Sequence, residues 1–452
     1  METATANMDL RVKITNRQIL QIALPIAVSI LVPQVNFITN NIFLSSLGEE
    51  QLAVAGITGV FYLIFAVIGF GLNNGMQSLI GRRAGEGRVN EISGLFNQGI
   101  RIALLFSVAA IIITYFVAPV VFSRTLHKAD HIQMATQFLY IRIWGLPLLY
   151  MYQLRNAVLV GTNHSKYLVA GTLAETITNI VLDYALIKGR LGFPQMGFNG
   201  AAISSIIAEG VGFLTVFLMM RAKGISKKLQ LHNDFSYQPA NTKLILVQSS
   251  PLMLQFMISV TSWEFFYILI EHHGERDLAI SNTMRNIFGL FGCVSWSFAA
   301  TSNTMVSNII GQGLQHRVKE LIIKIMTLSL SFAAIIFIIL NISDGFLLKV
   351  YGQGDDFIKA AVPVVRVVSA ALVLMSVSTV WLNAVTGTGN TRINLQIEIV
   401  AITLYCIYAY IVLEKLNMPI TWGWASECVY WTAMLIPSFF YIQSGKWKGK
   451  KI

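Results

Sequence analysis

Long apolar stretches separated by short polar loops run along the whole chain. Each stretch contains about 20 residues or more, which is the length that an α-helix needs to cross a bilayer. The pattern therefore predicts twelve transmembrane helices. Their expected ranges are 18–47, 52–80, 94–119, 133–160, 168–188, 197–220, 244–271, 278–310, 325–348, 361–386, 394–413 and 420–443. Interior prolines predict kinks in several of these helices, at Pro25, Pro33, Pro147, Pro251, Pro363 and Pro437.

The composition agrees with this pattern. Of the 452 residues, 55% are hydrophobic and 12% are charged, and the mean hydropathy is +0.62. Soluble domains carry about 25% charged residues, so the composition predicts an all-α polytopic membrane protein. The first apolar stretch is too long for the core of a signal peptide, and we expect it to remain as the first span.

The basic residues of the loops are distributed unevenly. With both termini placed in the cytoplasm, the cytoplasmic loops and ends hold 20 Lys and Arg residues, and the outer loops hold 8. Because positive residues favour the cytoplasmic side, the count predicts cytoplasmic termini. It also accounts for most of the net charge of +11 without a nucleic-acid partner, and we expect none. We expect a monomer in the plasma (inner) membrane of a bacterium, with the lipid bilayer as its surroundings.

The two halves of the chain resemble each other at one fixed offset along the sequence. Pro25 corresponds to Pro251, and the loops that begin at Gly48 and Gly161 correspond to those that begin at Gly274 and Gly387. Each half holds six predicted helices, so we expect two parallel repeats related by a pseudo-two-fold axis along the membrane normal.

This repeat divides the chain. We expect an N-terminal six-helix lobe at residues 1–220, a basic cytoplasmic linker at 221–243 and a C-terminal six-helix lobe at 244–452. Between the second and third helices of each half the offset is slightly larger, because Gly81 pairs with Gly311 and Arg88 pairs with Arg317. We interpret this increase as about one extra turn in the eighth helix.

Motifs of enzymes do not occur in the chain. All seven histidines lie in predicted loops or at helix ends, and the sequence contains no HExxH, P-loop or GxSxG pattern. Cys293, Cys406 and Cys428 lie in apolar stretches without metal-ligand spacing. We expect no enzymatic activity and no cofactor, so any pumping must use an ion gradient or a separate ATPase.

Two polar residues interrupt the fifth predicted helix. Asn179 and Asp183 are four residues apart and therefore share one helix face. A carboxylate inside a bilayer costs about 2.5–3.5 kcal/mol on insertion scales, so Asp183 is a candidate functional residue; the alternative is a structural pair with a neighbouring helix. In the first helix, Asn36 and Asn40 also share a face. They are candidate partners of Asp183, although asparagines often form plain interhelical hydrogen bonds.

The C-terminal lobe contains one candidate ion pair. Glu264 and Arg285 stand ten residues before and eleven after Gly274, which places them at matched depth in antiparallel helices. We predict a pair with either a structural or a gating role. The other buried acids are Glu175, Glu209, Glu398 and Glu427. We expect Arg142, Arg155 and Arg366 to reach the interface from nearby helix ends.

Several motifs together resemble the multidrug and toxic compound extrusion (MATE) transporters over nearly the whole chain. They are Leu24-Pro25, Ser46-Leu47-Gly48, Gly81-Arg-Arg-Ala-Gly-Glu-Gly87, Asn179-Ile-Val-Leu-Asp183 and Met196-Gly-Phe-Asn-Gly-Ala-Ala202. The resemblance implies two six-helix lobes arranged in a V, alternating access, and export of amphipathic, often cationic compounds in exchange for H⁺ or Na⁺. It also implies a cation site in the first lobe that contains Asn179 and Asp183.

The chain departs from the family pattern at the expected acids. Asn40 stands where many prokaryotic relatives carry Asp, and Ser259 and Met375 stand near the positions of acids in relatives with a second-lobe site. Glu264, which follows Trp263, is similar to a later acid of plant and animal members. The cation-coupling candidates are thus Asp183, Asn179, Asn40 and Asn36, with Na⁺ possible at Asp183 and Asn179. The candidates for substrate contact or gating are Glu264, Arg285, Glu175 and Trp263.

A second function fits the same superfamily. Arg142, Arg155, Arg285 and Arg366 could meet a pyrophosphate in a central cavity, as in a flippase for a lipid-linked saccharide. The two functions differ in whether these arginines converge on the cavity.

Overall fold

The computed structural model describes residues 9–126, 128–231, 236–342, 346–349 and 354–450. All regular elements of this part of the chain are helices. The first half contains α1 (Asn16–Ser45), α2 (Glu49–Glu86), α3 (Val89–Thr125), α4 (Ala129–Arg142), η1 (Ile143–Gly145), α5 (Leu146–Gly161), η2 (Ser165–Tyr167), α6 (Leu168–Lys188) and α7 (Gly197–Ala222). The short α8 (Ile225–Lys228) follows.

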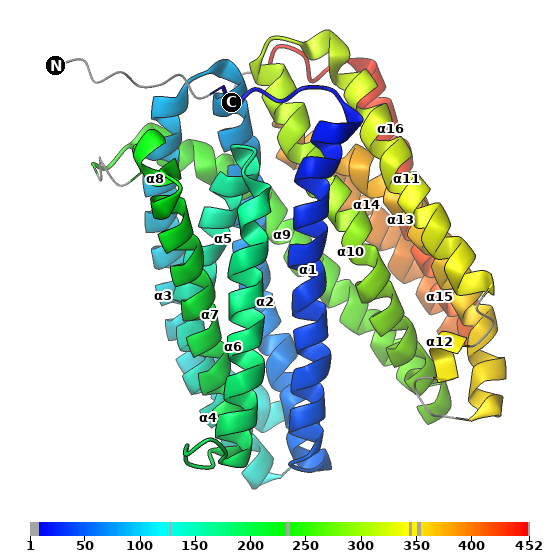
Figure 1. Ribbon diagram of the computed structural model, residues 1–452. Coiled ribbons are helices and arrows are strands. Elements are labelled where there is room, and N and C mark those ends of the chain that lie inside the picture. The colour runs from blue at the N-terminus through cyan, green and yellow to red at the C-terminus, as the bar shows by residue number, and fades with distance from the viewer. Residues whose placement is uncertain (1–8, 127, 232–235, 343–345, 350–353, 451–452) are drawn as a thin grey trace.

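The second half contains α9 (Pro239–Glu271), α10 (Glu275–Gly311), η3 (Gln315–Arg317), α11 (Val318–Ile342), α12 (Phe346–Lys349), α13 (Asp355–Gly387), α14 (Thr391–Ala409), η4 (Tyr410–Lys415), α15 (Ile420–Trp424) and α16 (Ser426–Ser444). These elements form two bundles that diverge as a V (Figure 1). The predicted twelve-helix, two-lobe fold is confirmed. The boundaries of the lobes and of the linker stay predictions, and residues 232–235 of that linker lie outside the described residues.

Eight helices of the described residues are long and apolar enough to cross a membrane. The other four crossings of the twelve-helix fold are α4 with α5, α6, α10, and α15 with α16. Two of these crossings are interrupted. The short helix η1 separates α4 from α5, with Pro147 in the first turn of α5, and α15 ends at Trp424 before α16 begins at Ser426.

The prediction that the eighth helix is one turn longer than the second is wrong. α10 has 37 residues and α2 has 38. The change of offset lies in the following loop, because α2 continues past Gly81 to Glu86, whereas α10 ends at Gly311 and is followed by η3. The sequence comparison had therefore matched Gly81, which lies inside α2, with Gly311, which is the last residue of α10.

The two lobes meet at the end of the molecule that carries the termini (Figure 1). There, α2 packs against α9 and α10. An added Cβ at Gly71 would lie 2.5 Å from Met253 Cα, and one at Gly85 would lie 2.0 Å from the backbone oxygen of Asn308. Glycine is thus required on α2 because backbone of the other lobe occupies the space of a side chain.

Hydrogen bonds join the lobes in the same region. Ser307 donates to the backbone oxygen of Ser78 at 2.6 Å, and Asn303 donates to that of Asn74 at 3.0 Å. Arg82 Nη2 lies 3.4 Å from the backbone oxygen of Gly387. The Gly81–Gly87 motif therefore forms part of the contact that closes this end of the V.

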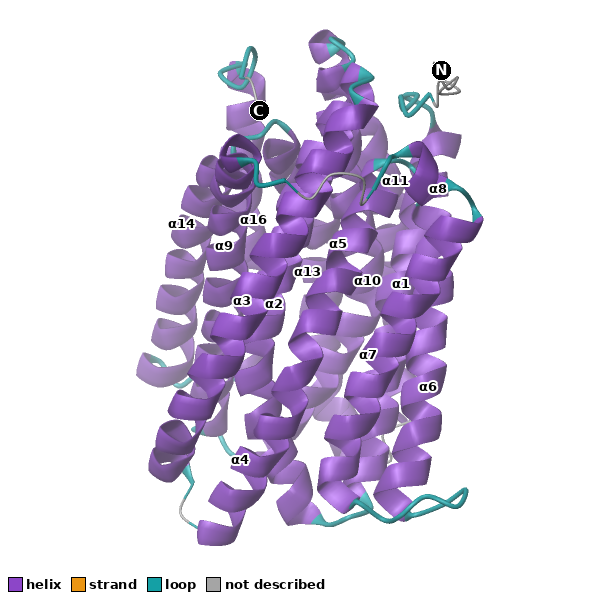
Figure 2. Cartoon of the chain, turned by 90° about the vertical axis from the view of Figure 1, so that its left-hand side faces the viewer, coloured by secondary structure: helices purple, strands orange, loops and turns teal. Residues whose placement is uncertain are grey.

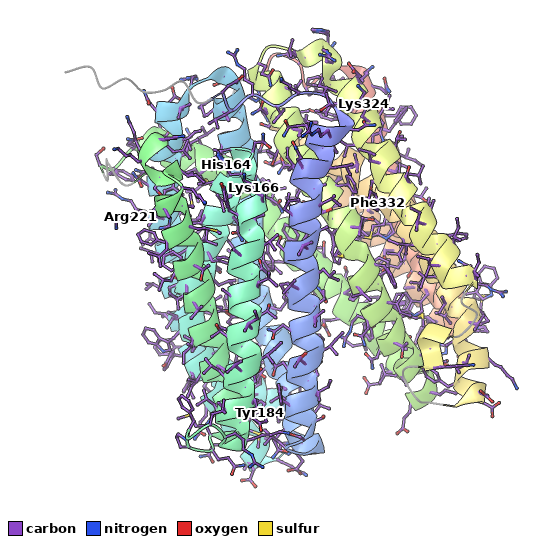
Figure 3. The ribbon with its side chains drawn as sticks, in the orientation of Figure 1. His164, Lys166, Tyr184, Arg221, Lys324 and Phe332 are labelled. Atoms are coloured by element: carbon purple, nitrogen blue, oxygen red, sulfur yellow. The ribbon has the colours of Figure 1, made fainter. Side chains whose placement is uncertain are left out.

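The two lobes are farthest apart at the end of the molecule opposite the termini (Figure 1). In the side view, α4 and the lower end of α7 mark this end of the N-terminal lobe (Figure 2). Lys166, Arg221 and Lys324 lie at the end that holds the termini, and Tyr184 lies at the opposite end (Figure 3). The basic loops counted in the sequence thus include three side chains that gather at the closed end.

Candidate functional site

Asp183 lies in the interior of the N-terminal lobe, on α6, and is fully buried. Ser204 on α7 donates a hydrogen bond from Oγ to Asp183 Oδ1. The other carboxylate oxygen, Oδ2, is buried and has no hydrogen-bond partner. Among the ion pairs of the described residues, none includes Asp183. The carboxyl group is therefore surrounded by neutral groups and is only partly hydrogen bonded.

Asn179 lies one turn earlier on α6 and connects three helices. Asn36 on α1 donates from Nδ2 to Asn179 Oδ1 at 2.9 Å. The Nδ2 atom of Asn179 lies 3.4 Å from the hydroxyls of both Ser204 and Ser205 on α7. The predicted residues Asn36, Asn179 and Asp183 thus belong to one polar cluster, with α7 as its third wall.

Asn40 lies one turn beyond Asn36. Both α1 and α6 run from the end with the termini to the opposite end (Figure 1), so a step of four residues on each helix places Asn40 level with Asp183. The Oδ1 atoms of Asn36 and Asn40 are buried and have no hydrogen-bond partner. With Asp183 Oδ2, the cluster therefore contains three buried oxygen atoms without a donor. We name this set, with the residues Asn36, Asn40, Asn179, Asp183, Ser204 and Ser205, the N-lobe oxygen cluster.

Oxygen atoms without a donor can accept a hydrogen bond, or they can coordinate a hard cation, which prefers oxygen ligands. Within the described residues, no group of three or more His, Cys, Asp and Glu side chains is placed to hold a metal ion. An ion in the N-lobe oxygen cluster would therefore depend on amide and hydroxyl oxygens in addition to the Asp183 carboxylate. Sequence reasoning missed Ser204 and Ser205. Their signal was a pair of hydroxyl residues one position beyond the Met196–Ala202 motif.

Glu175 lies two turns before Asp183 and packs against α7, where an added Cβ at Gly212 would lie 3.1 Å from Glu175 Oε2. Beside it is a buried ion pair between Arg142 of α4 and Glu209 of α7. The two guanidinium nitrogens of Arg142 donate to Glu209 at 2.5 and 3.1 Å, and Arg142 also lies 3.9 Å over the ring of Tyr62. We name this the Arg142–Glu209 pair.

The expectation that Arg142 and Arg155 reach the membrane interface is wrong. Arg142 is bound inside the lobe because Glu209 and Tyr62 surround it. Arg155 is 2% exposed, and its guanidinium lies 5.0 and 4.8 Å from the rings of Phe213 and Phe217. These contacts hold both arginines within the N-terminal lobe. Arg366, by contrast, is exposed.

The predicted pair in the C-terminal lobe is not in direct contact. Glu264 and Arg285 lie close enough for an electrostatic interaction, but no ion pair or hydrogen bond joins them among the contacts of the described residues. The Arg285 guanidinium instead lies 5.3 Å from the ring of Tyr267. Trp263 donates from Nε1 to Glu427 on α16 at 3.3 Å. Of the residues predicted to contact substrate or to act in gating, Trp263 thus forms a hydrogen bond with a buried acid.

Glu398 on α14 is, with Glu427, a buried acid among the described residues of this lobe. It accepts hydrogen bonds from Gln255 and Ser259 of α9 and from Tyr430 of α16. The acid that contacts Ser259 thus comes from a different helix than the family pattern suggested. The sequence signal was a single Glu in an apolar stretch, which gave no hint of its partners.

The four arginines that motivated the flippase hypothesis do not converge. Arg142 and Arg155 contact partners inside the N-terminal lobe, whereas Arg285 and Arg366 lie on α10 and α13 of the other lobe. A shared pyrophosphate site would need these side chains to leave their present contacts.

Comparison with known proteins identifies the family. The MatE family model matches residues 25–185 and 251–411, and the two matched segments are related by the same offset that relates Pro25 to Pro251. A probable multidrug resistance protein NorM from Thermotoga maritima is 20% identical over 96% of this chain and 94% of its own. A protein of the same name from Synechocystis is 28% identical, but the match spans only 45% of this chain and 44% of the relative.

Solved structures agree with the fold. An outward-facing multidrug resistance MATE family transporter of the MOP superfamily superposes with a TM-score of 0.89 at 18% identity, covering 98% of both chains. A MOP superfamily transporter from Pyrococcus furiosus, described as having a binding pocket of reversed polarity, has a TM-score of 0.87 at 17% identity. Because the family model covers more than half of the sequence, in both lobes, the chain belongs to the MATE family of membrane transporters.

Proposed function

We propose that the protein is a secondary antiporter that exports amphipathic, cationic organic compounds in exchange for H⁺ through alternating access. The observation that carries the proposal is the N-lobe oxygen cluster, in which Asp183 is fully buried, lacks an ionic partner and keeps one oxygen without a donor. An isolated buried charge is costly, and binding of a cation at Asp183 removes that cost.

When Asp183 binds a proton, the cluster offers an acceptor for the new hydrogen-bond donor. A protonated Asp183 becomes a hydrogen-bond donor, and the buried Oδ1 of Asn40 stands level with it on α1 without a donor of its own. Protonation would then join α1 to α6 through a new hydrogen bond. Release of the proton would remove that bond, which gives the two states of the lobe different stabilities.

Na⁺ could use the same oxygens, and the choice between the two ions rests on the number of acids. Only one carboxylate is present in the cluster, since Asn40 stands where a second acid would complete it. A single carboxylate surrounded by neutral amides suits a proton, whose binding neutralises it fully. For this reason we propose H⁺ as the coupling ion.

The positions of the basic residues support an orientation. Lys166, Arg221 and Lys324 lie at the closed end of the V with both termini (Figure 3), and positive residues favour the cytoplasmic side. We therefore propose that the termini are cytoplasmic in a bacterial inner membrane and that the V opens outward. Both lobes belong to one chain, so we propose that the protein acts as a monomer.

The substrate class rests on the relatives and on the acids of the interior. Proteins named for multidrug resistance match the chain in both lobes, and buried carboxylates attract cations. The testing experiment is efflux of ethidium from proteoliposomes under a pH gradient or a Na⁺ gradient, each imposed alone. We expect efflux with the pH gradient. Efflux with the Na⁺ gradient only would reject H⁺ coupling, and no efflux with either would reject antiport of cationic compounds.

A further inference from the structure

The C-terminal lobe contains a buried carboxylate that the proposed function does not use. Glu398 of α14 is 0% exposed. Gln255 Nε2 and Ser259 Oγ of α9 donate to it at 3.1 and 2.6 Å, and Tyr430 Oη of α16 donates at 2.5 Å. One acidic side chain thus connects three helices of this lobe.

Glu398 has no cationic partner in the described part of the chain. Among the ion pairs of the described residues, none includes Glu398. On α16, the titratable groups that face it are Tyr430 and, beyond it, Glu427. On α14 the groups on either side are Arg392, which is exposed, and Tyr405. On α9 the next such group is Glu264, more than a turn beyond Ser259. The neighbouring α13 has no Asp, Glu, Lys, Arg or His at 367–387. A negative charge here has no counterion, and a proton would remove the cost of burying it.

The hydrogen bonds can be satisfied in both protonation states. The Ser259 hydroxyl has one proton and two acceptors in reach, Glu398 Oε1 at 2.6 Å and the backbone oxygen of Gln255 at 3.0 Å. When Glu398 is ionised, Ser259 donates to it. When Glu398 is protonated, the acid donates to Ser259 Oγ and the Ser259 hydroxyl turns to Gln255. The cluster therefore accepts or loses a proton without an orphaned polar atom.

The same α9 segment contacts the other lobe. Met253 and Ser249 face Gly71 and Gly75 of α2 so closely that an added Cβ would lie 2.5 Å and 2.9 Å from their Cα atoms. Gln255 follows Met253 by two residues, so the bonds to Glu398 attach α14 to the helix that touches α2. A change in those bonds would therefore act on the helix that forms the contact between the lobes.

The two acids lie near opposite ends of their helices. Glu398 is seven residues from the start of α14, which lies at the closed end, and this spacing corresponds to about 10 Å. Asp183 is five residues from the far end of α6, or about 8 Å. The acids therefore sit closer to opposite faces of the membrane.

We propose that Glu398 is a second proton-binding site, which takes up and releases a proton in the same transport cycle as Asp183. This inference rests on the proposed H⁺ antiport and deepens it. It assigns one proton to each lobe, and it makes the bond from Glu398 to α9 the element through which the C-terminal lobe senses protonation.

The test counts protons released when ethidium binds to the detergent-solubilised full chain, with a pH-sensitive dye in weakly buffered solution. Glu398→Gln keeps the size of the side chain and removes the titrating group, and it should release about half as many protons per bound ethidium as the wild type, by loss of one of two equal sites. Glu398→Asp should restore the count. The matched control is Glu271→Gln at the exposed end of α9, which should release as many as the wild type.

The outcomes separate this inference from the proposed function. An unchanged count in Glu398→Gln, or a count in Glu398→Asp as low as in the amide variant, would overturn the role of Glu398. A halved count in Glu398→Gln with an unchanged count in Asp183→Asn would support Glu398 and remove Asp183 from the mechanism. No proton release by the wild type would overturn both.

A measurement that does not require the Glu398 variant to fold keeps the proposal testable. Infrared difference spectra of Asp183→Asn, recorded on ethidium binding, should retain one carboxyl signal that changes protonation state. Absence of any such signal in a variant that still binds ethidium would overturn the proposal.

Discussion

The interiors of the two lobes differ although their helices correspond. At the offset that relates Pro25 to Pro251, the residues Asn179, Asp183, Ser204 and Ser205 of the N-terminal lobe correspond to Tyr405, Ala409, Tyr430 and Trp431. Three of these residues of the C-terminal lobe are aromatic, and their rings pack together. The ring centroids lie 5.7 Å apart in Tyr405 and Tyr430 and 4.8 Å apart in Tyr430 and Trp431. The N-terminal lobe has small polar side chains and unpaired oxygens at the same places.

This difference separates what the repeat preserves from what it does not. The loops that begin at Gly48 and Gly161 recur at the fixed offset, at Gly274 and Gly387, and both lobes keep the same architecture. The residues that could bind an ion do not recur. In the C-terminal lobe the acids stand at Glu398 and Glu427, which correspond to Thr172 and Ala201 in the other lobe. Each lobe has therefore acquired its own buried carboxylates on a common frame.

The largest effect is expected from removing the acid of the N-terminal lobe. Asp183→Asn should reduce ethidium efflux driven by a pH gradient to the rate of protein-free liposomes, because the amide cannot take up a proton. Ethidium binding should persist. The control is Asp130→Asn, an exposed position at the start of α4. Gradient-driven efflux by Asp183→Asn at the wild-type rate would refute the assignment.

A large effect is also expected at the contact between lobes. In Gly75→Ala the new Cβ would meet Ser249 Cα at 2.9 Å, so α2 and α9 must separate and the closed end should loosen. We expect efflux to fall by about tenfold, equivalent to about 1.4 kcal/mol of barrier. Gly59→Ala, on the same helix with no atom within 4 Å of its added Cβ, is the matched control. Equal efflux by the two variants would argue against a close contact at Gly75.

Loss of the Arg142–Glu209 pair should affect stability rather than coupling. Glu209→Gln leaves a buried guanidinium without its carboxylate, which costs about 3–5 kcal/mol. Thermal unfolding in detergent measures the loss. Replacing both residues by apolar ones, Arg142→Met with Glu209→Leu, should recover part of it. A double variant as unstable as the sum of the single changes would show that the pair does not interact.

The smallest effect is expected for Glu264 and Arg285, where direct contact is absent. A double-mutant cycle on thermal stability should give a coupling energy below about 1 kcal/mol, as for exposed or separated charges. The Arg142–Glu209 pair serves as the positive control in the same assay. Coupling of equal size in both lobes would mean that Glu264 and Arg285 pair in a conformation different from the one described.

Periodicity and repeats were sufficient to predict the helices, because transmembrane spans and recurring loops leave strong local signals. The predicted placement of Asp183, Asn179 and Asn36 in one cluster also followed from helix spacing. The partners of Arg142 and Glu398 did not, because they come from helices distant in sequence. Nothing in the local pattern around Arg142 distinguishes a side chain that reaches the interface from one that binds Glu209.

The central claim is that protons move through Asp183 when the substrate moves, and reversed coupling tests it most directly. Ethidium is added outside proteoliposomes that contain a pH-sensitive dye and have no imposed pH gradient. The wild type should take up ethidium and make the lumen alkaline, since antiport exchanges it for lumenal protons, whereas Asp183→Asn should leave the lumenal pH unchanged. Equal alkalinisation by Asp183→Asn and the wild type would contradict the account.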